Sequence, residues 1–412
     1  MLLINCKTLG LEQFHDNEHP PYAILSHTWD RRGKEVSYHD MLEDKKEMRD
    51  GFHKIVKSCN LASSQGISYV WIDTCCIDKS SNAELGEAIN SMYRYYKESK
   101  VCYAYLADVD SSQGSFAHSR WFTRGWTLQE LIAPDRVEFY GNNWRYLGNK
   151  INLREDIIAA SGIPESALYH TKSLDSFPVA QRLSWAAKRR TTRTEDAAYC
   201  LIGLLGIEMG LLYGEGSLAF KRLWETILQS REDYSIFLYT GLVNRFKTWE
   251  SPPSINEPQE YPLNSRHTPR RTIENWDGLE QHSPIDVISA RSFAEYLPPI
   301  EREPLAPQTT GRGLRLNLYA KSVRKELIAW IYCTQERRGK TYALCTRIIP
   351  SAVESNTPRH YIRGVISGEV YYVAIDRLRG FELKDIYISL KPREDPAMRG
   401  GHNLSDHYID YA

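Results

Sequence analysis

Short apolar runs alternate with helical spacings over the first 150 residues. Four continuous runs predict strands, at 22–26, 69–72, 101–106 and 136–140. Apolar positions that recur every three to four residues predict the intervening helices, at about 52–62, at 85–96 and from near Trp126 to just before Pro134. Wholly apolar strands that alternate with helices indicate an α/β fold, in which a parallel sheet is covered on both faces.

The rest of the chain divides into three parts. Residues 151–240 carry helical spacings, and Thr192 and Glu195 have the separation of a capping box ahead of a helix near 197–202, so this part predicts a helical extension. Residues 241–310 hold most of the prolines and predict a linker or irregular segment. Residues 311–412 contain five runs of β-forming residues between turn residues, which predict a mainly β C-terminal module, largely antiparallel.

Charge and cysteine content narrow the function classes. The 52 basic residues balance 52 acidic ones, so we expect no nucleic-acid partner. Eight cysteines show no metal-binding spacing and mostly lie in apolar runs, which indicates buried thiols in the reducing cytoplasm and no metal site. The most apolar stretch, 197–213, is interrupted by Glu208 and glycines and is shorter than the ~20 residues of a span, so we expect no membrane crossing.

Polar side chains follow two of the predicted strands. Ser26, His27 and Trp29 come after the first strand, and Asp73 and Asp78 come after the second. Ligands of parallel sheets bind beyond the carboxyl ends of the strands, so we expect these five residues to bind substrate. The histidine suits a general base, although a histidine after a strand more often bonds a nearby backbone group.

Three blocks of sequence resemble the HET (heterokaryon incompatibility) domain of filamentous fungi. The blocks lie at 22–29, 71–96 and 124–131, and the segment 184–216 resembles the continuation of that family. The resemblance covers roughly the first 240 residues and departs from the family at Asp30, where a glycine is usual. It implies a role in growth arrest and cell death when incompatible cells fuse, with self-association or a death-signalling protein as partner.

The HET family in turn resembles TIR domains remotely, so the resemblance implies a TIR-like sheet. Trp126 and Glu130 have the Trp-x-x-x-Glu spacing of the NAD-cleaving TIR proteins. In those proteins the glutamate is catalytic. The resemblance therefore implies that Glu130 is catalytic, that Trp126 helps to bind substrate, and that NAD or a related nucleotide is hydrolysed with no cofactor required.

The chemistry of NAD cleavage gives such residues a role. The ribose–nicotinamide bond breaks through an oxocarbenium-like state, as in glycoside hydrolysis. Nicotinamide leaves a cationic ring as a neutral molecule, so no strong acid is needed, and a carboxylate near the ribose stabilises the developing positive charge. Residues four apart lie on one face of a helix, so Trp126 could line a pocket into which Glu130 points.

Other interpretations stay open at this stage. A glutamate on a helix usually lies in solvent or pairs with an arginine, here Arg124 or Arg136. The domain could then be a non-catalytic signalling or adaptor module. Asp73, Asp78 and Glu84 could serve a metal-dependent nuclease, although the neutral charge counts against it. Cys75 lacks an evident histidine partner for nucleophilic catalysis.

Overall fold

The computed structural model describes most of the chain up to residue 236 and the strands of a C-terminal sheet. The described residues are 1–15, 18–29, 34–110, 116–230, 233, 235–236, 280–282, 308–310, 313–323, 326–337, 340–350, 362–374 and 382–388.

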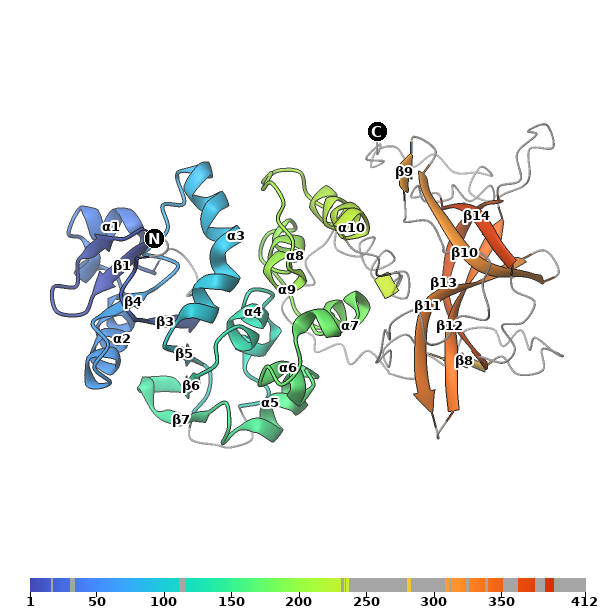
Figure 1. Ribbon diagram of the computed structural model, residues 1–412. Coiled ribbons are helices and arrows are strands. Elements are labelled where there is room, and N and C mark those ends of the chain that lie inside the picture. The colour runs from blue at the N-terminus through green and yellow to red at the C-terminus, as the bar shows by residue number, and fades with distance from the viewer. Residues whose placement is uncertain are drawn as a thin grey trace, which may run out of the picture.

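A seven-stranded sheet organises the N-terminal part (Figure 1), and its strands lie in the order β2-β1-β4-β3-β5-β6-β7. The four central strands β4, β3, β5 and β6 are mutually parallel, which confirms the predicted α/β class. The strands are β1 (Leu2–Asn5), β2 (Leu11–Gln13), β3 (Tyr22–His27), β4 (Tyr69–Trp71), β5 (Val101–Tyr105), β6 (Val137–Tyr140) and β7 (Tyr146–Asn149).

Antiparallel strands flank this parallel centre on both sides. β1 pairs β4, β2 pairs β1, and β7 pairs β6, all antiparallel. These three strands were not predicted, and each of them is only partly buried.

Helices cover both faces of the sheet. The first 150 residues form α1 (Tyr38–Leu42), α2 (Phe52–Ser64), α3 (Asn82–Glu98) and α4 (Thr127–Ile132), with 3-10 turns at Lys46–Met48, Arg120–Thr123 and Asn142–Trp144. Successive side chains of a strand point to opposite faces. In β3, Ser26 contacts α4 on one face, while His27 contacts α2 on the other. Tyr96 of α3 donates to the carbonyl of Leu25, which places α3 beside β3 as well.

The predicted helical extension follows the sheet. It comprises α5 (Arg154–Ser161), α6 (Glu165–Leu168), a 3-10 turn at Leu174–Ser176, α7 (Val179–Ser184), α8 (Asp196–Tyr199), α9 (Ile202–Leu205) and α10 (Leu218–Ser230). Figure 1 shows α9 beside α3, and these two helices pack on each other.

The capping box predicted at Thr192 and Glu195 is wrong. Glu195 is itself the residue that precedes α8, and no side chain caps that helix. Its carboxylate instead accepts hydrogen bonds from the backbone N–H groups of Gly214 and Gly216, at 2.9 and 3.0 Å. Both glycines have positive φ, so the carboxylate holds a turn that favours glycine.

A second, mainly antiparallel sheet forms the C-terminal part, as predicted. Its strands are β8 (Glu280–His282), β9 (Gln308–Thr310), β10 (Gly313–Val323), β11 (Glu326–Arg337), β12 (Lys340–Pro350), β13 (Ile362–Ala374) and β14 (Glu382–Ile388). Only the β13–β14 pair is parallel among the described pairings. β8 and β9 fall inside the range 241–310 that we predicted as a linker, and the remainder of that range lies outside the described residues.

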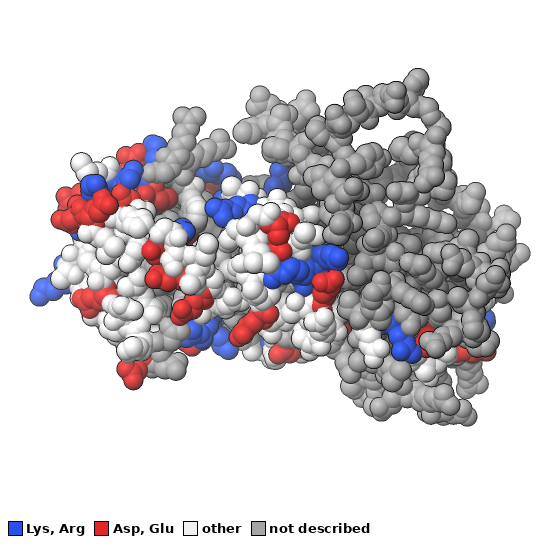
Figure 2. All heavy atoms as spheres, turned by 90° about the horizontal axis from the view of Figure 1, so that it is seen from above, with Lys and Arg blue, Asp and Glu red and all other residues white. Residues whose placement is uncertain are grey.

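Charges of both signs intermingle over the described surface in Figure 2, and acidic side chains gather at the left end of that view. Six cysteines of the N-terminal part are free thiols, and all of them except Cys6 are buried: Cys6, Cys59, Cys75, Cys76, Cys102 and Cys200. Within the described part of the chain, no helix is long and apolar enough to cross a membrane.

Candidate functional site

The centre of the candidate site is a hydrogen bond between β3 and α4. The Ser26 hydroxyl donates to Oε2 of Glu130, and the indole N–H of Trp121 donates to the Ser26 oxygen at 2.7 Å. Ser26 is fully buried and Glu130 is 7% exposed. The pair lies where the order of the parallel strands reverses, because β3 has β4 on one side and β5 on the other. Ligands of open α/β sheets bind at this point.

Glu130 is held in an apolar environment. Burial and, to a smaller extent, the charge of Asp73 together raise the pKa of Glu130 to about 8, against the opposing effects of the Ser26 hydrogen bond and the charge of Arg124. Pairing with Arg124 or Arg136 was one interpretation of Glu130. Among the described residues, Glu130 forms no salt bridge with either arginine. At neutral pH the carboxyl therefore mostly retains its proton.

Two buried cations hold the short helix that carries Glu130. The Arg189 guanidinium donates to the carbonyl of Arg124 at 2.9 Å and to the Thr127 hydroxyl at 2.8 Å, at the start of α4. The Lys150 ammonium donates to the carbonyl of Pro134 at 2.8 Å, just beyond its end. Arg189 belongs to the helical extension, so that extension helps to position the Glu130 helix.

On the opposite face of the sheet, His27 belongs to a chain of charged groups. Its Nε2 lies 3.3 Å from Oδ1 of Asp73, and its Nδ1 lies 3.3 Å from the Lys54 ammonium. Lys54 is 2% exposed and donates to the carboxylate of Glu35 at 2.5 Å. An ammonium can only donate, so Nδ1 of His27 accepts and its Nε2–H is directed to Asp73.

Asp73 is the ionised carboxylate of the site. Burial opposes its charge, but the Lys79 ammonium and hydrogen bonds from His27 and Trp29 outweigh that and lower the pKa of Asp73 well below its usual value. The Trp29 indole N–H donates to Oδ2 of Asp73 at 3.0 Å. Lys79 lies 3.7 Å from the same oxygen and 3.8 Å from the centre of the Trp29 ring. Trp29 is 46% exposed, so its ring is both fixed in place and accessible.

The structure brings together five of the seven predicted site residues. Ser26 and Glu130 form one group, and His27, Trp29 and Asp73 form a second group at the same edge of the sheet. Asp78 accepts hydrogen bonds from Ser80 within its own loop. Trp126 lies beside Asp196 in the helical extension. The tryptophan that contacts Ser26 is Trp121 instead.

Other chemistry considered for the site gains little support. No group of three or more His, Cys, Asp or Glu side chains among the described residues could hold a metal ion. Burial raises the pKa of Cys75 to about 12, and its thiol donates to the carbonyl of Val36. A thiol in that environment is a poor nucleophile.

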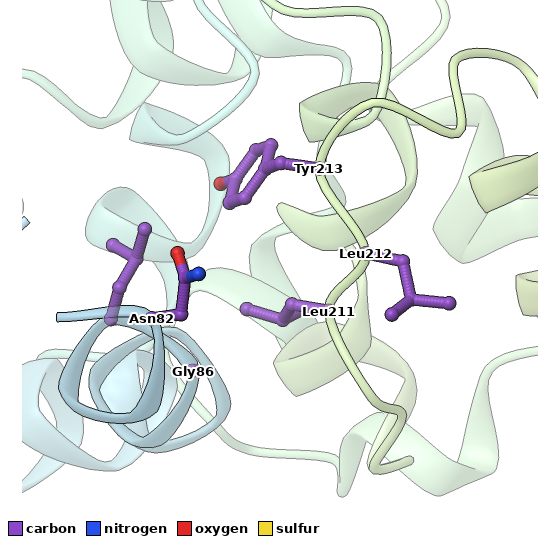
Figure 3. Close-up of a pocket in the computed structure, with 6 residues that line it drawn as sticks. Asn82, Gly86, Leu211, Leu212 and Tyr213 are labelled. Atoms are coloured by element: carbon purple, nitrogen blue, oxygen red, sulfur yellow. The ribbon is translucent and has the colours of Figure 1, made fainter. Parts of the chain in front are cut away.

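A cavity of about 340 Å³ lies away from these groups, between α3 and the segment before α10 (Figure 3). It is lined by Asn82, Leu85, Gly86, Leu211, Leu212 and Tyr213. None of the predicted site residues lines it.

Several residues of the site were missed by sequence reasoning. Lys54 and Glu35 complete the His27 chain, Trp121 donates to Ser26, and Tyr96 lies beside the Glu130 carboxyl. The local sequence gives no sign that Lys54 is buried, because a lysine near the start of a helix is usually solvated. The Trp121 contact to Ser26 spans 95 residues, and no local pattern predicts it.

Comparison with known proteins relates part of this chain to a fungal family. Residues 22–120 match the family model "Heterokaryon incompatibility protein (HET)". Among curated proteins, "Vegetative incompatibility protein HET-E-1" of Podospora anserina is 44% identical over 219 residues, which are 50% of this chain and 16% of that protein. No solved structure matches. The HET resemblance is thus confirmed, while the likeness to TIR domains stays a prediction.

Proposed function

We propose that this chain acts in fungal vegetative incompatibility and cell death, because its residues 22–120 match the HET family model. The relative that matches half of the chain is a vegetative incompatibility protein, which supports this role. We further propose that the α/β domain acts by hydrolysing the N-glycosidic bond of NAD or a related nucleotide. The observation that carries the chemical part is the buried Ser26–Glu130 pair at the switch point of the sheet.

The proposed roles follow from the two groups of side chains. A ribose bound across the edge of the sheet would have the Glu130 carboxyl on one side and the Asp73 carboxylate on the other. Asp73 would stabilise the positive charge that develops on the sugar as the bond breaks. The half-exposed ring of Trp29 would pack against a flat base. Ser26 and Trp121 would keep the Glu130 side chain in one orientation.

Incubation of the purified full-length chain with NAD tests the proposal, with the released base measured by chromatography. Glu130→Gln keeps the shape and the hydrogen bond from Ser26 but cannot exchange a proton. We expect it to lose turnover. Glu138→Gln is a matched control, because Glu138 is equally buried at 6% exposed but pairs with Arg136 away from the site. Equal turnover by wild type and Glu130→Gln would contradict the role of Glu130.

A non-catalytic signalling module is the second candidate, and the deep burial of Glu130 favours it. In that case cell killing depends on surfaces that contact another protein. Glu130→Gln would then kill cells as wild type does, and polar substitutions at exposed apolar residues such as Met48 or Ile151, which are 82% and 75% exposed, would abolish killing. A killing assay that compares these variants decides between the two candidates.

A further inference from the structure

The two carboxyl groups of the site differ in whether a cation lies beside them. Glu130 contacts the Ser26 hydroxyl and the Tyr96 ring hydroxyl, and no salt bridge to it exists among the described residues. Asp73 accepts from Trp29 and lies 3.7 Å from the Lys79 ammonium. Burial without an ion pair favours the neutral acid at Glu130, although the hydrogen bond from Ser26 works against it, and the Lys79 ammonium favours the anion at Asp73. Such a division is how enzymes assign an acid and an anion to two carboxyl groups.

We propose that this site is built to cleave an N-glycosidic bond whose base must be protonated as it leaves, as in an adenine nucleotide, with Glu130 as the proton donor and Asp73 as the anion. This inference rests on the proposed nucleotide hydrolysis and names the class of bond. It differs from cleavage of the nicotinamide bond, because nicotinamide leaves a cationic ring and needs no acid.

The roles of the neighbouring residues follow from their hydrogen bonds. His27 has no free ring nitrogen, since Nδ1 accepts from Lys54 and the Nε2–H is directed to Asp73. It therefore acts as a positioning residue rather than as a base. The Trp29 indole is fixed against Asp73, so a base stacked on its ring would place the attached sugar next to the carboxylate.

The step balances without any co-reactant. Glu130 transfers its proton to a ring nitrogen of the base as the bond between C1′ and the base nitrogen breaks. The electron pair of that bond stays with the base, and Asp73 faces the resulting oxocarbenium ion. Water adds to C1′ and loses its proton to Asp73. Asp73 then releases that proton to solvent and Glu130 takes up one proton, so both carboxyl groups return to their starting states. The products are the free base and the ribosyl hydroxyl compound.

NAD offers both kinds of bond in one molecule, which makes it the best probe. We expect the full-length chain to release adenine from NAD and from AMP in excess over nicotinamide. Since the pKa of Glu130 is raised to about 8, kcat/KM for adenine release should be flat below pH 8 and fall about tenfold per pH unit above it. If the Glu130 carboxylate were the active form, kcat/KM would instead rise with pH up to about pH 8.

Two variants test the separate roles. Glu130→Gln should lower adenine release by about 10²- to 10⁴-fold, while Glu138→Gln should leave it unchanged. Asp73→Asn should reduce the rate and also move the alkaline limb to lower pH, because the charge of Asp73 raises the pKa of Glu130. A purely structural role for Asp73 would not move that limb.

The outcomes separate this inference from the proposed function. Release of nicotinamide without adenine would overturn the inference and leave nucleotide hydrolysis in place. Adenine release that Glu130→Gln leaves intact would overturn the assignment of the proton donor. Release of neither base by the wild-type chain would overturn both the inference and the hydrolysis proposal.

Discussion

Replacement of Glu130 by glutamine should stabilise the protein, even though it removes the proposed catalytic group. Burial raises the pKa of this carboxyl from 4.5 to about 8. The folded state therefore keeps a proton that the unfolded state loses above pH 4.5. Its contribution to stability is complete below pH 4.5 and is lost progressively as the pH rises to about 8.

The size of the effect follows from that rise. Each pH unit between the two pKa values costs the wild type about 1.4 kcal/mol, which amounts to about 3 kcal/mol at pH 7 and about 5 kcal/mol above pH 8. Glutamine carries no charge at any of these pH values and still accepts the Ser26 hydrogen bond. The advantage of Glu130→Gln over wild type should therefore grow steadily between pH 5 and pH 8.

Urea unfolding at pH 5, 6, 7 and 8, followed by tryptophan fluorescence, measures this difference. Glu138→Gln provides the contrast, because it removes the partner of Arg136 and should lower stability without a comparable gain toward alkaline pH. A constant difference between wild type and Glu130→Gln over this pH range would refute the claim that Glu130 is buried as a neutral acid. The conclusion does not depend on any enzymatic activity.

Three further predictions concern the scaffold of the site. Ser26→Ala should cost about 1–3 kcal/mol in urea unfolding, since it leaves the buried Trp121 N–H without its acceptor. Lys54→Met should lower the free energy of unfolding by about 3–5 kcal/mol, because it leaves the Glu35 charge buried and unpaired. The double variant Lys54→Met/Glu35→Gln leaves no such charge and should lose much less stability, so equal losses would contradict the ion pair. Gly203→Ala should lower the Tm, because its new Cβ would lie 2.3 Å from a side-chain carbon of α3, and an unchanged Tm would show that α9 is not packed as described.

Local patterns predicted the elements that bury a continuous surface. The runs that became β3, β4, β5 and β6 are apolar because both faces of a parallel strand are covered, and α2 and α3 show the spacing of a helix packed on a sheet. The flanking antiparallel strands β1, β2 and β7 escaped prediction because they are only partly buried.

The rule for ligand sites of parallel sheets predicted the position of some of the candidate residues. It selected Ser26 and Asp73 correctly as residues at the carboxyl edge, because the position of a residue after a strand decides which edge it reaches. It could not separate Asp73 from Asp78, since the loop after β4 turns the second side chain back onto Ser80. Local sequence also cannot show that Glu130 is buried, because that depends on β3 and the helical extension.

The short antiparallel strands at both ends of the N-terminal sheet restrict how copies of this domain can assemble. An exposed edge strand can accept a strand from another molecule, and the number of hydrogen bonds gained depends on its length. β2 has three residues and β7 has four, so a strand added at either edge would gain few hydrogen bonds. If the domain associates with itself, we expect the contact to form through helical faces. Substitutions designed to block assembly therefore belong on the helices rather than on the sheet edges.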